Sequence, residues 1–284
     1  MNGNFLLRIR YVKRGRLSFL SHKETVHAME RIVARAHLPY ALTQGFSPHM
    51  RSSFGPALPV GCAGCAELFD VLLTSYIPAD EALERLQKAA VPDLMPLECF
   101  YEDPHVSSIV ADFTLSDWQA DIAGTTQVAL RDALDKLLEC GCIEIVKIKK
   151  TRRGQVEKVK RTEFEGRLLS TKIAVLPMQT QAESSISAQA DAAAVAQTPA
   201  QMQAAATTQA LEQESAQTQA QAQGEYEIVS CLWTSQDKGN GALRPDLFVN
   251  ELIKDIPNAQ LLALKRLDLR RQENGQGGEQ NNNI

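Results

Sequence analysis

The order of strand-like and helix-like segments along the chain is the feature that most constrains its fold. Strands are predicted where apolar and polar residues alternate, and helices where apolar residues recur at three- and four-residue spacing. The first half shows the order strand, helix, strand, strand, helix, strand, and the second half repeats it. The predicted strands are 5–12, 39–43, 68–73, 94–101, 109–122, 142–149, 156–164, 168–176, 225–233 and 259–269, and the predicted helices are 22–37, 78–90, 125–140 and 245–256.

Two βαββαβ units in tandem predict an α+β fold whose antiparallel sheets carry helices on one face, the ferredoxin-like arrangement. We place the first unit at residues 1–104 and the second at 105–176 together with 225–271. The insert 177–224 holds twelve Gln, fifteen Ala and four acidic residues but no Lys, Arg or aromatic residue. Such a composition cannot bury enough apolar surface to fold, so the insert and the tail 272–284 are predicted to be disordered. A loop between two strands accepts a long insertion at little entropic cost.

The segment 43–61 in the first unit concentrates three Gly and three Pro around polar and aromatic side chains. Glycine permits positive φ and proline fixes φ, so this loop has a defined shape. A shaped loop that presents His49 and Arg51 beside an aromatic residue is typical of a binding or catalytic site. Ser21, with a Glu three residues later, predicts a capping box at the start of the first helix. We expect the loop to fold against that helix start and to bring His22 and His49 into one concave patch.

The formal net charge of −4 conceals two basic regions. The first sixty residues carry nine Lys or Arg against two acidic residues, and residues 147–172 carry ten against three. This asymmetry favours an anionic partner; the alternative is a solvated strand face that acidic neighbours balance after folding. The candidate phosphate-binding surface comprises Arg8, Arg10, Lys13, Arg14, Arg16 and Arg51, with Phe46 or Tyr40 as a stacking face.

A second basic element is a predicted hairpin with basic residues on both arms and at its turn. A basic β-ribbon suits a nucleic-acid groove or strand. Equally, lysines on an exposed edge strand protect it against aggregation. The basic residues of this hairpin are Lys147, Lys149, Lys150, Arg152, Arg153, Lys158, Lys160 and Arg161.

No pattern in the sequence points to a metal or a cofactor, and we expect none. Cys62 and Cys65 have the spacing of a metal-binding pair, but the other four cysteines form no second pair at that spacing. The phosphate-binding loops GxGxxG and GxxxxGK[ST] are missing. The N-terminus has no signal-peptide pattern, and no run approaches the roughly 18 apolar residues of a membrane helix. We therefore expect a cytoplasmic protein with no membrane partner, whose six cysteines are mostly thiols.

A set of motifs, dense in the first hundred residues and sparse afterwards, is similar to a known family. The motifs are Arg8-x-Arg10-Tyr11-x-Lys13, Phe19-Leu20-Ser21-His22, Gln44-Gly45-Phe46-Ser47-Pro48-His49, Pro59-Val60-Gly61 and Glu67, with later echoes at Arg244-Pro245-Asp246 and Arg266-x-Asp268-Leu269. Together they resemble the bacterial radical-SAM-linked domain of unknown function, which occurs alone or at the C-terminus of a radical-SAM protein. The resemblance implies a stand-alone form of that module with a separate radical-SAM protein as its partner. Lys23-Glu24 departs from the Leu-Asp expected there, which leaves Glu24 as the available carboxylate.

The resemblance also singles out residues for a site. The family's recurrent residues occur here as Ser21, His22, Gln44, Gly45, Phe46, Pro48, His49 and Glu67. The predicted substrate-binding set consists of these residues without Glu67, together with Arg8, Arg10 and Arg51.

Three hypotheses for function follow. The first is an accessory module that binds RNA or presents a substrate to the radical-SAM partner. The second is an RNA-acting enzyme in which His22 or His49 is the acid or base, with Glu67 as a further candidate. The third is a protein-interaction scaffold in which the basic surfaces are incidental. The sequence leaves open which substrate is bound and whether any bond is made or broken.

Overall fold

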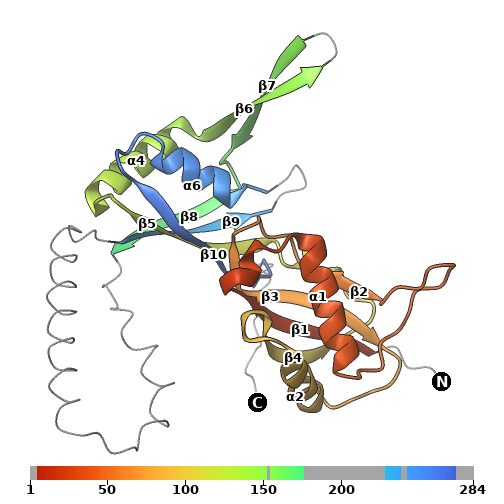
Figure 1. The fold of residues 1–284 in the computed structure, drawn as a ribbon. Coiled ribbons are helices and arrows are strands. Elements are labelled where there is room, and N and C mark those ends of the chain that lie inside the picture. Colours follow the sequence, from red (N-terminus) through yellow and green to blue (C-terminus); the bar gives the residue numbers. More distant parts are fainter. Residues whose placement is uncertain (1–4, 152–153, 176–227, 238–241, 273–284) are drawn as a thin grey trace, which may run out of the picture.

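The computed structural model describes residues 5–151, 154–175, 228–237 and 242–272. Its architecture belongs to the predicted α+β class, with helices packed on one eight-stranded sheet and a separate two-stranded ribbon (Figure 1). The sheet order is β4-β1-β3-β10-β5-β9-β8, and β2 also pairs with β3. The strands are β1 (Phe5–Lys13), β2 (Ser52–Phe54), β3 (Ala63–Leu73), β4 (Pro96–Glu102), β5 (Leu115–Ala123), β6 (Cys142–Thr151), β7 (Gly154–Glu163), β8 (Leu168–Val175), β9 (Val229–Gln236) and β10 (Gln260–Arg270), and the α-helices are α1 (His22–Arg35), α2 (Ala79–Ala89), α3 (Ile109–Asp112), α4 (Gln127–Cys140) and α6 (Pro245–Ile253).

In the first unit, β1 pairs antiparallel with both β3 and β4, and α1 and α2 cover one face of these strands. The alternation of β1 places Leu7 and Ile9 in the core with Met29 of α1. Helix α1 begins where the sequence predicts, because Ser21 and Glu24 form the capping box. The Glu24 carboxylate accepts a hydrogen bond from the Ser21 backbone N–H at 2.8 Å, and the Ser21 hydroxyl accepts one from the Glu24 N–H at 3.4 Å.

In the second unit, β5 pairs antiparallel with β9 and β10, and β8 pairs antiparallel with β9. Helices α4 and α6 supply Leu130 and Phe248 to its core, where Trp118 and Trp233 stack with their ring centroids 6.2 Å apart. Gly141 ends α4 with a left-handed φ of 66°, a conformation that favours glycine. In both units the first strand lies between the fourth and the third, an order compatible with two ferredoxin-like units.

The predicted strand 109–122 is wrong at its start. Residues 109–112 form the single turn of α3, in which the Asp112 N–H donates to the Ser108 carbonyl at 3.0 Å. This turn buries Ile109 with Phe113, whereas the neighbouring Val110 is half exposed. Two adjacent apolar residues fit a strand or a helical turn equally well. The predicted disordered insert 177–224 lies outside the described residues, as does the predicted disordered tail 272–284 apart from residue 272.

The two units meet edge to edge in the sheet. Strand β10 runs parallel to β3, with Lys265 opposite Ala63 and Arg266 opposite Gly64. The short strand β2 pairs with residues 69–71, further along the same edge of β3. The sequence predicts two sheets; the structure joins their strands into one.

A buried ion pair lies at this junction. Arg266 is 1% exposed; its Nε donates to Glu67 at 2.9 Å, and its Nη2 donates both to the second carboxylate oxygen and to the Pro56 carbonyl. The guanidinium also lies 5.3 Å from the centre of the Trp118 ring. Gly64 leaves room for the carboxylate, since a Cβ there would lie 2.5 Å from the Glu67 Cγ. One side chain therefore ties β10 to β3, to β5 and to the Gly/Pro-rich segment.

We predict that Arg266→Ala lowers the free energy of unfolding by about 3–5 kcal/mol, because the Glu67 carboxylate remains buried without a cation. Arg85→Ala is the matched control, since it removes a partly exposed pair with Glu81 within α2 and costs about 0.5 kcal/mol or less. Denaturant unfolding of both variants measures the difference. Equal stability of the two variants would show that the junction does not depend on this pair.

Candidate functional site

The nine basic residues among the first sixty fall into two groups, and those of the first group find their partners within the fold. Arg8 lies in the core, where its Nε and Nη2 donate to the two oxygens of Asp70 at 2.7 and 2.9 Å and its Nη1 donates to Glu102 at 3.0 Å. Each of the three guanidinium nitrogens therefore donates to a carboxylate. The other members of this group are Arg10, which pairs with Glu98 and Asp268, and Arg14, which pairs with Asp93. The buried Lys13 belongs to it as well, although its ammonium donates to the Leu20 carbonyl and forms no ion pair among the described residues.

Arg8 and Lys13 are therefore not parts of a solvent-facing phosphate surface, contrary to the prediction from the sequence. Strand β1 alternates as predicted, but the face opposite α1 and α2 is covered as well. The ring of Phe113 lies between Arg8 and Arg271, 5.3 and 4.9 Å from their guanidinium carbons. Alternation separates the two faces of a strand without saying which elements cover each face.

The second group is exposed, and none of its members has a carboxylate partner within the described part of the chain. It comprises Arg16, Lys23, Arg31, Arg35 and Arg51. Three of these residues, Lys23, Arg31 and Arg35, lie on the solvent side of α1 and are called here the basic face of α1. Their charges are among the nine noted in the sequence, but their grouping on one helix face was not predicted. The signal was the four-residue spacing of positions 23, 27, 31 and 35, which places residues on one side of a helix.

Residues 43–49 form an exposed hairpin that extends past β2 (Figure 1). The Thr43 N–H donates to the His49 carbonyl at 2.8 Å, and the His49 N–H donates to the Thr43 hydroxyl at 2.9 Å. A β-bridge between Leu42 and Met50 closes the base. Phe46 is fully exposed. Gln44, Gly45 and Pro48 are also exposed.

The later part of the Gly/Pro-rich segment, residues 54–61, packs against the start of α1. The Gly61 N–H donates to the Ser18 carbonyl at 3.0 Å. Phe54 stacks on Phe69 with centroids 5.0 Å apart and meets the His22 ring edge-on at 6.1 Å. The predicted contact between this loop and the helix start therefore exists for residues 54–61.

His22 and His49 do not share a pocket, so the expected single concave patch is wrong. His22 lines a cavity of about 10 Å³ with Tyr11, Lys13 and Glu67. His49 lies on the exposed hairpin, with its Nε2 3.4 Å from the Ser47 hydroxyl. The hairpin satisfies its own backbone hydrogen bonds and does not need the helix start as a partner.

The His22 side chain in this small cavity is better suited to hydrogen bonding than to proton transfer. Partial burial lowers the pKa of His22 below its ordinary value, and the positive charge of Lys13 lowers this pKa further, against the attraction of Glu67. A neutral imidazole both donates and accepts hydrogen bonds. Both oxygens of Glu67 are already held by Arg266. The volume suffices for about one water molecule.

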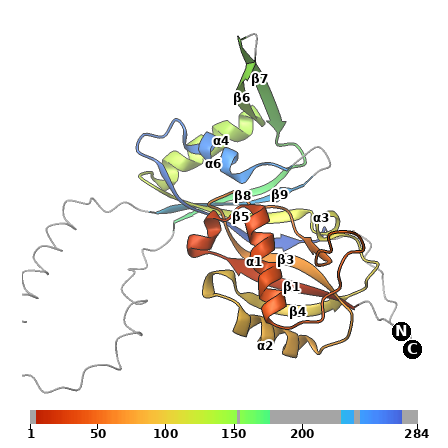
Figure 2. The same cartoon turned by 45° about the vertical axis from the view of Figure 1, so that its right-hand side comes forward.

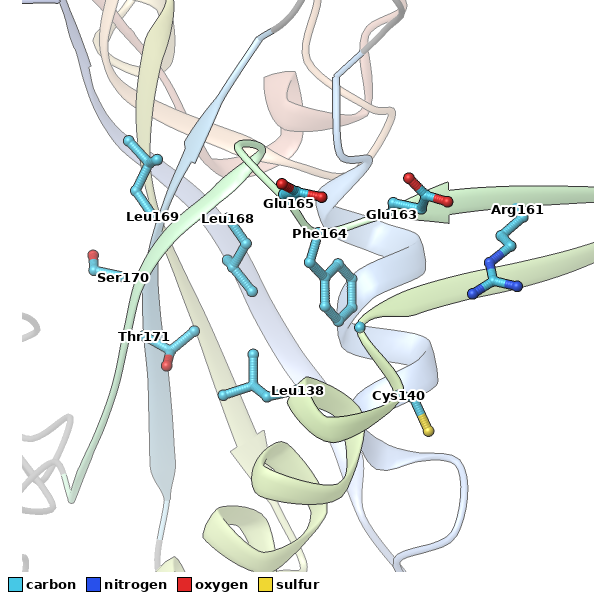
Figure 3. Close-up of a pocket in the computed structure, with 11 residues that line it drawn as sticks. Leu138, Cys140, Arg161, Glu163, Phe164, Glu165, Leu168, Leu169, Ser170 and Thr171 are labelled. Atoms are coloured by element: carbon cyan, nitrogen blue, oxygen red, sulfur yellow. The ribbon is translucent and has the colours of Figure 1, made fainter.

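Larger cavities lie elsewhere in the described part of the chain, none of them predicted from the sequence. One of about 270 Å³ lies between residues 56–59 and the residues that precede α6, and it brings together Arg244 and Arg266. Another, of about 680 Å³, lies between the end of α4 and strands β7 and β8, with Phe164 and Leu168 against it (Figure 3). The first cavity therefore brings residues of the C-terminal motifs, Arg244, Pro245 and Arg266, next to the Gly/Pro-rich segment.

The cysteine pair is split between core and surface. Cys62 is buried and Cys65 is exposed. Burial raises the pKa of the Cys62 thiol to about 12 and also raises the pKa of Cys65, which disfavours the thiolate form that binds metals. Among the described residues, no three or more His, Cys, Asp or Glu side chains are grouped to hold a metal ion. Nor does any helix in the described ranges have the length and apolarity to cross a membrane.

The fold and these surfaces define an α+β protein with a basic helix face and a protruding Gly/Pro hairpin in its first unit. A family model described as an uncharacterized protein conserved in bacteria (DUF2344) matches residues 6–187, more than half of the chain. The chain therefore belongs to this bacterial family. No curated protein matches it.

We predict that His22 titrates below the ordinary histidine value of about 6.5, because burial and the charge of Lys13 both disfavour its protonated form. Lys13→Met removes that charge and should raise the His22 pKa towards the ordinary value. An NMR titration of the imidazole protons in both proteins measures the shift, with thermal unfolding as the check on folding. A His22 pKa that is unchanged in a folded Lys13→Met variant would contradict this electrostatic account.

Proposed function

We propose that this chain is a cytosolic accessory module that binds RNA and works with a separate radical-SAM protein. One observation carries the RNA part: five exposed cations of the first unit have no carboxylate partner in the described part of the chain. A protein surface of this kind neutralises phosphates and releases their counterions, which drives association with a polyanion.

The stability of the helix accounts for only part of the basic face of α1: Arg35 in the last turn interacts favourably with the helix dipole, but Lys23 and Arg31 lie outside that turn. Arg31 and Arg35 are separated by four residues, and like charges at that spacing destabilise a helix by about 0.2–0.5 kcal/mol. By contrast, α2 carries its cations as ion pairs, Arg85 with Glu81 and Lys88 with Glu84. The two helices cover the same face of the sheet, so the difference between them favours an external anion as the partner of α1.

The ribbon formed by β6 and β7 supports the same function. It projects beyond α4 and α6 in both views (Figures 1 and 2). Its register sets Lys147 opposite Lys158, and Lys149 and Lys160 occupy further positions on the same pleat. A paired ribbon that carries lysines on both strands suits a nucleic-acid groove or strand. The predicted turn residues Arg152 and Arg153 lie outside the described residues.

The radical-SAM part of the proposal is supported by the resemblance and by the place of its most specific motif. Gln44-Gly45-Phe46-Ser47-Pro48-His49 forms the exposed hairpin and contributes little to the core. A fully exposed Phe46 at such a position has no packing role in this chain, and exposed aromatic side chains are enriched where proteins bind each other. The hairpin is therefore the surface that we assign to the partner protein.

We predict that the double variant Arg31→Ala/Arg35→Ala weakens binding of a single-stranded RNA. The slope of log affinity against log salt concentration should fall by about 2, one for each lost phosphate contact. The double variant Arg85→Ala/Lys88→Ala removes the same net charge from α2 and should leave the slope unchanged. Salt-dependent fluorescence anisotropy measures both. If the two double variants changed the slope equally, RNA binding would depend only on the net charge of the chain, and an RNA site on α1 would be refuted.

We predict that Phe46→Ala lowers the affinity for a radical-SAM protein of the host by about tenfold, as expected for an aromatic side chain at the centre of an interface. Phe19→Ala is the control, because it removes another exposed ring of the first unit outside the hairpin. Affinity purification of the tagged chain, with the partner identified by mass spectrometry, measures the loss. Recovery of no radical-SAM protein with the unaltered chain would remove this half of the proposal.

A further inference from the structure

The cavity of about 270 Å³ between the two units contains polar groups that the fold does not use. The Nε and Nη2 of Arg266 donate to Glu67 and to the Pro56 carbonyl, while its Nη1 donates to no residue in the described ranges. The side chain is nonetheless 1% exposed. Within the described part of the chain, Nη1 is thus the nitrogen of this guanidinium that is left to donate to a ligand or a water in the cavity.

Asp237 supplies a complementary group in the lining of the same cavity. Its backbone N–H donates to the Thr114 carbonyl at 2.8 Å, but its carboxylate has no hydrogen-bond or ion-pair partner among the described residues. Burial raises the pKa of Asp237, and the charge of Arg266 only partly opposes that effect. Arg244, the other cation in the cavity lining, is already paired with Asp246.

Apart from Ser116, the remaining lining of the cavity is apolar. Pro56, Leu58 and Leu243 line the cavity together with the indole of Trp118. The volume lies just below the roughly 300–1,000 Å³ of pockets that take drug-sized molecules, so the space suits one fused ring system. A ligand here needs adjacent N–H donors for Asp237, an acceptor for Arg266 and a planar apolar body.

We propose that this cavity binds a guanine base. Guanine presents two adjacent donors, N1–H and the N2 amino group, to a carboxylate, and its O6 and N7 accept from a guanidinium, the commonest base contact of arginine. Adenine places an acceptor, N1, beside its single amino group, and cytosine and uracil each present only one donor towards a carboxylate. The apolar side chains and the indole in the lining supply the kind of surface against which proteins hold an unstacked base.

This inference deepens the proposed function, because the guanine would come from a bound RNA; a free guanine nucleotide is the other source of the same chemistry. Both tryptophans of the chain report on the cavity, since Trp118 lines it and stacks on Trp233. Titration of the full chain with GMP should change the tryptophan fluorescence with saturation. AMP, CMP and UMP should bind at least tenfold more weakly.

The variant Asp237→Asn replaces one acceptor oxygen by a donor and should weaken GMP binding at least tenfold while the chain stays folded. Asp255→Asn, which alters an exposed carboxylate outside the cavity, is the matched control and should bind GMP normally. If GMP saturates the chain but RNA does not bind, the cavity stands as a nucleotide site and the RNA function falls.

A second arm compares RNAs that expose a single unpaired G or a single unpaired A. A preference of at least tenfold for G that Asp237→Asn abolishes, without binding of GMP, assigns the cavity to a base extruded from RNA. If the Arg31/Arg35 double variant weakens RNA binding but GMP binds nowhere and G is not preferred, the proposed function stands and the guanine site is refuted. GMP binding that Asp237→Asn leaves unchanged refutes the site as well.

Discussion

The buried pair of Glu67 and Arg266 is the constraint on which the arrangement of the two units depends. The residues are 199 positions apart in the chain, and a buried ion must find its counter-ion. Apolar side chains of similar volume would hold two strands together with comparable free energy. They would tolerate a shift along the strand, however, whereas a bidentate pair is satisfied in one register only. The main contribution of the pair is therefore to fix the register in which β10 lies beside β3.

The same pair organises the surroundings of the site. The second donor group of Arg266 binds the Pro56 carbonyl and so holds the later Gly/Pro-rich residues between two cavities. His22 faces one of these cavities and Asp237 the other. The first unit thus divides its charges: cations near the junction and on β1 are satisfied within the fold, while those on α1 face solvent. The net charge of the chain does not reveal this division. The cations on α1 that face solvent are the ones available to an anionic partner.

Periodicity predicted most of the elements and their boundaries, because each helix and strand buries one regular face. The predicted strand 39–43 is wrong: it forms only isolated bridges at Tyr40 and Leu42, and the short strand β2 lies at Ser52–Phe54 instead. The capping box of α1 was also predictable from the sequence, since Ser21 and Glu24 interact within one helical turn. The errors about the site concern contacts between distant parts of the chain. Burial of Arg8 requires acids from β3 and β4 together with the Phe113 ring. His49 was assigned to the helix start because composition does not reveal that the hairpin closes on itself through Leu42 and Met50.

The shortness of β2 has a consequence for how the chain can be divided. Three residues of β2 pair with only part of one edge of β3, and β10 occupies the portion near Gly64. A fragment truncated after β4 would keep that stretch of backbone N–H and C=O groups without partners, next to a carboxylate deprived of its guanidinium. Unpaired strand edges recruit other chains. The N-terminal half, although it carries most of the recognisable motifs, is thus built to be completed by the C-terminal half rather than to exist alone.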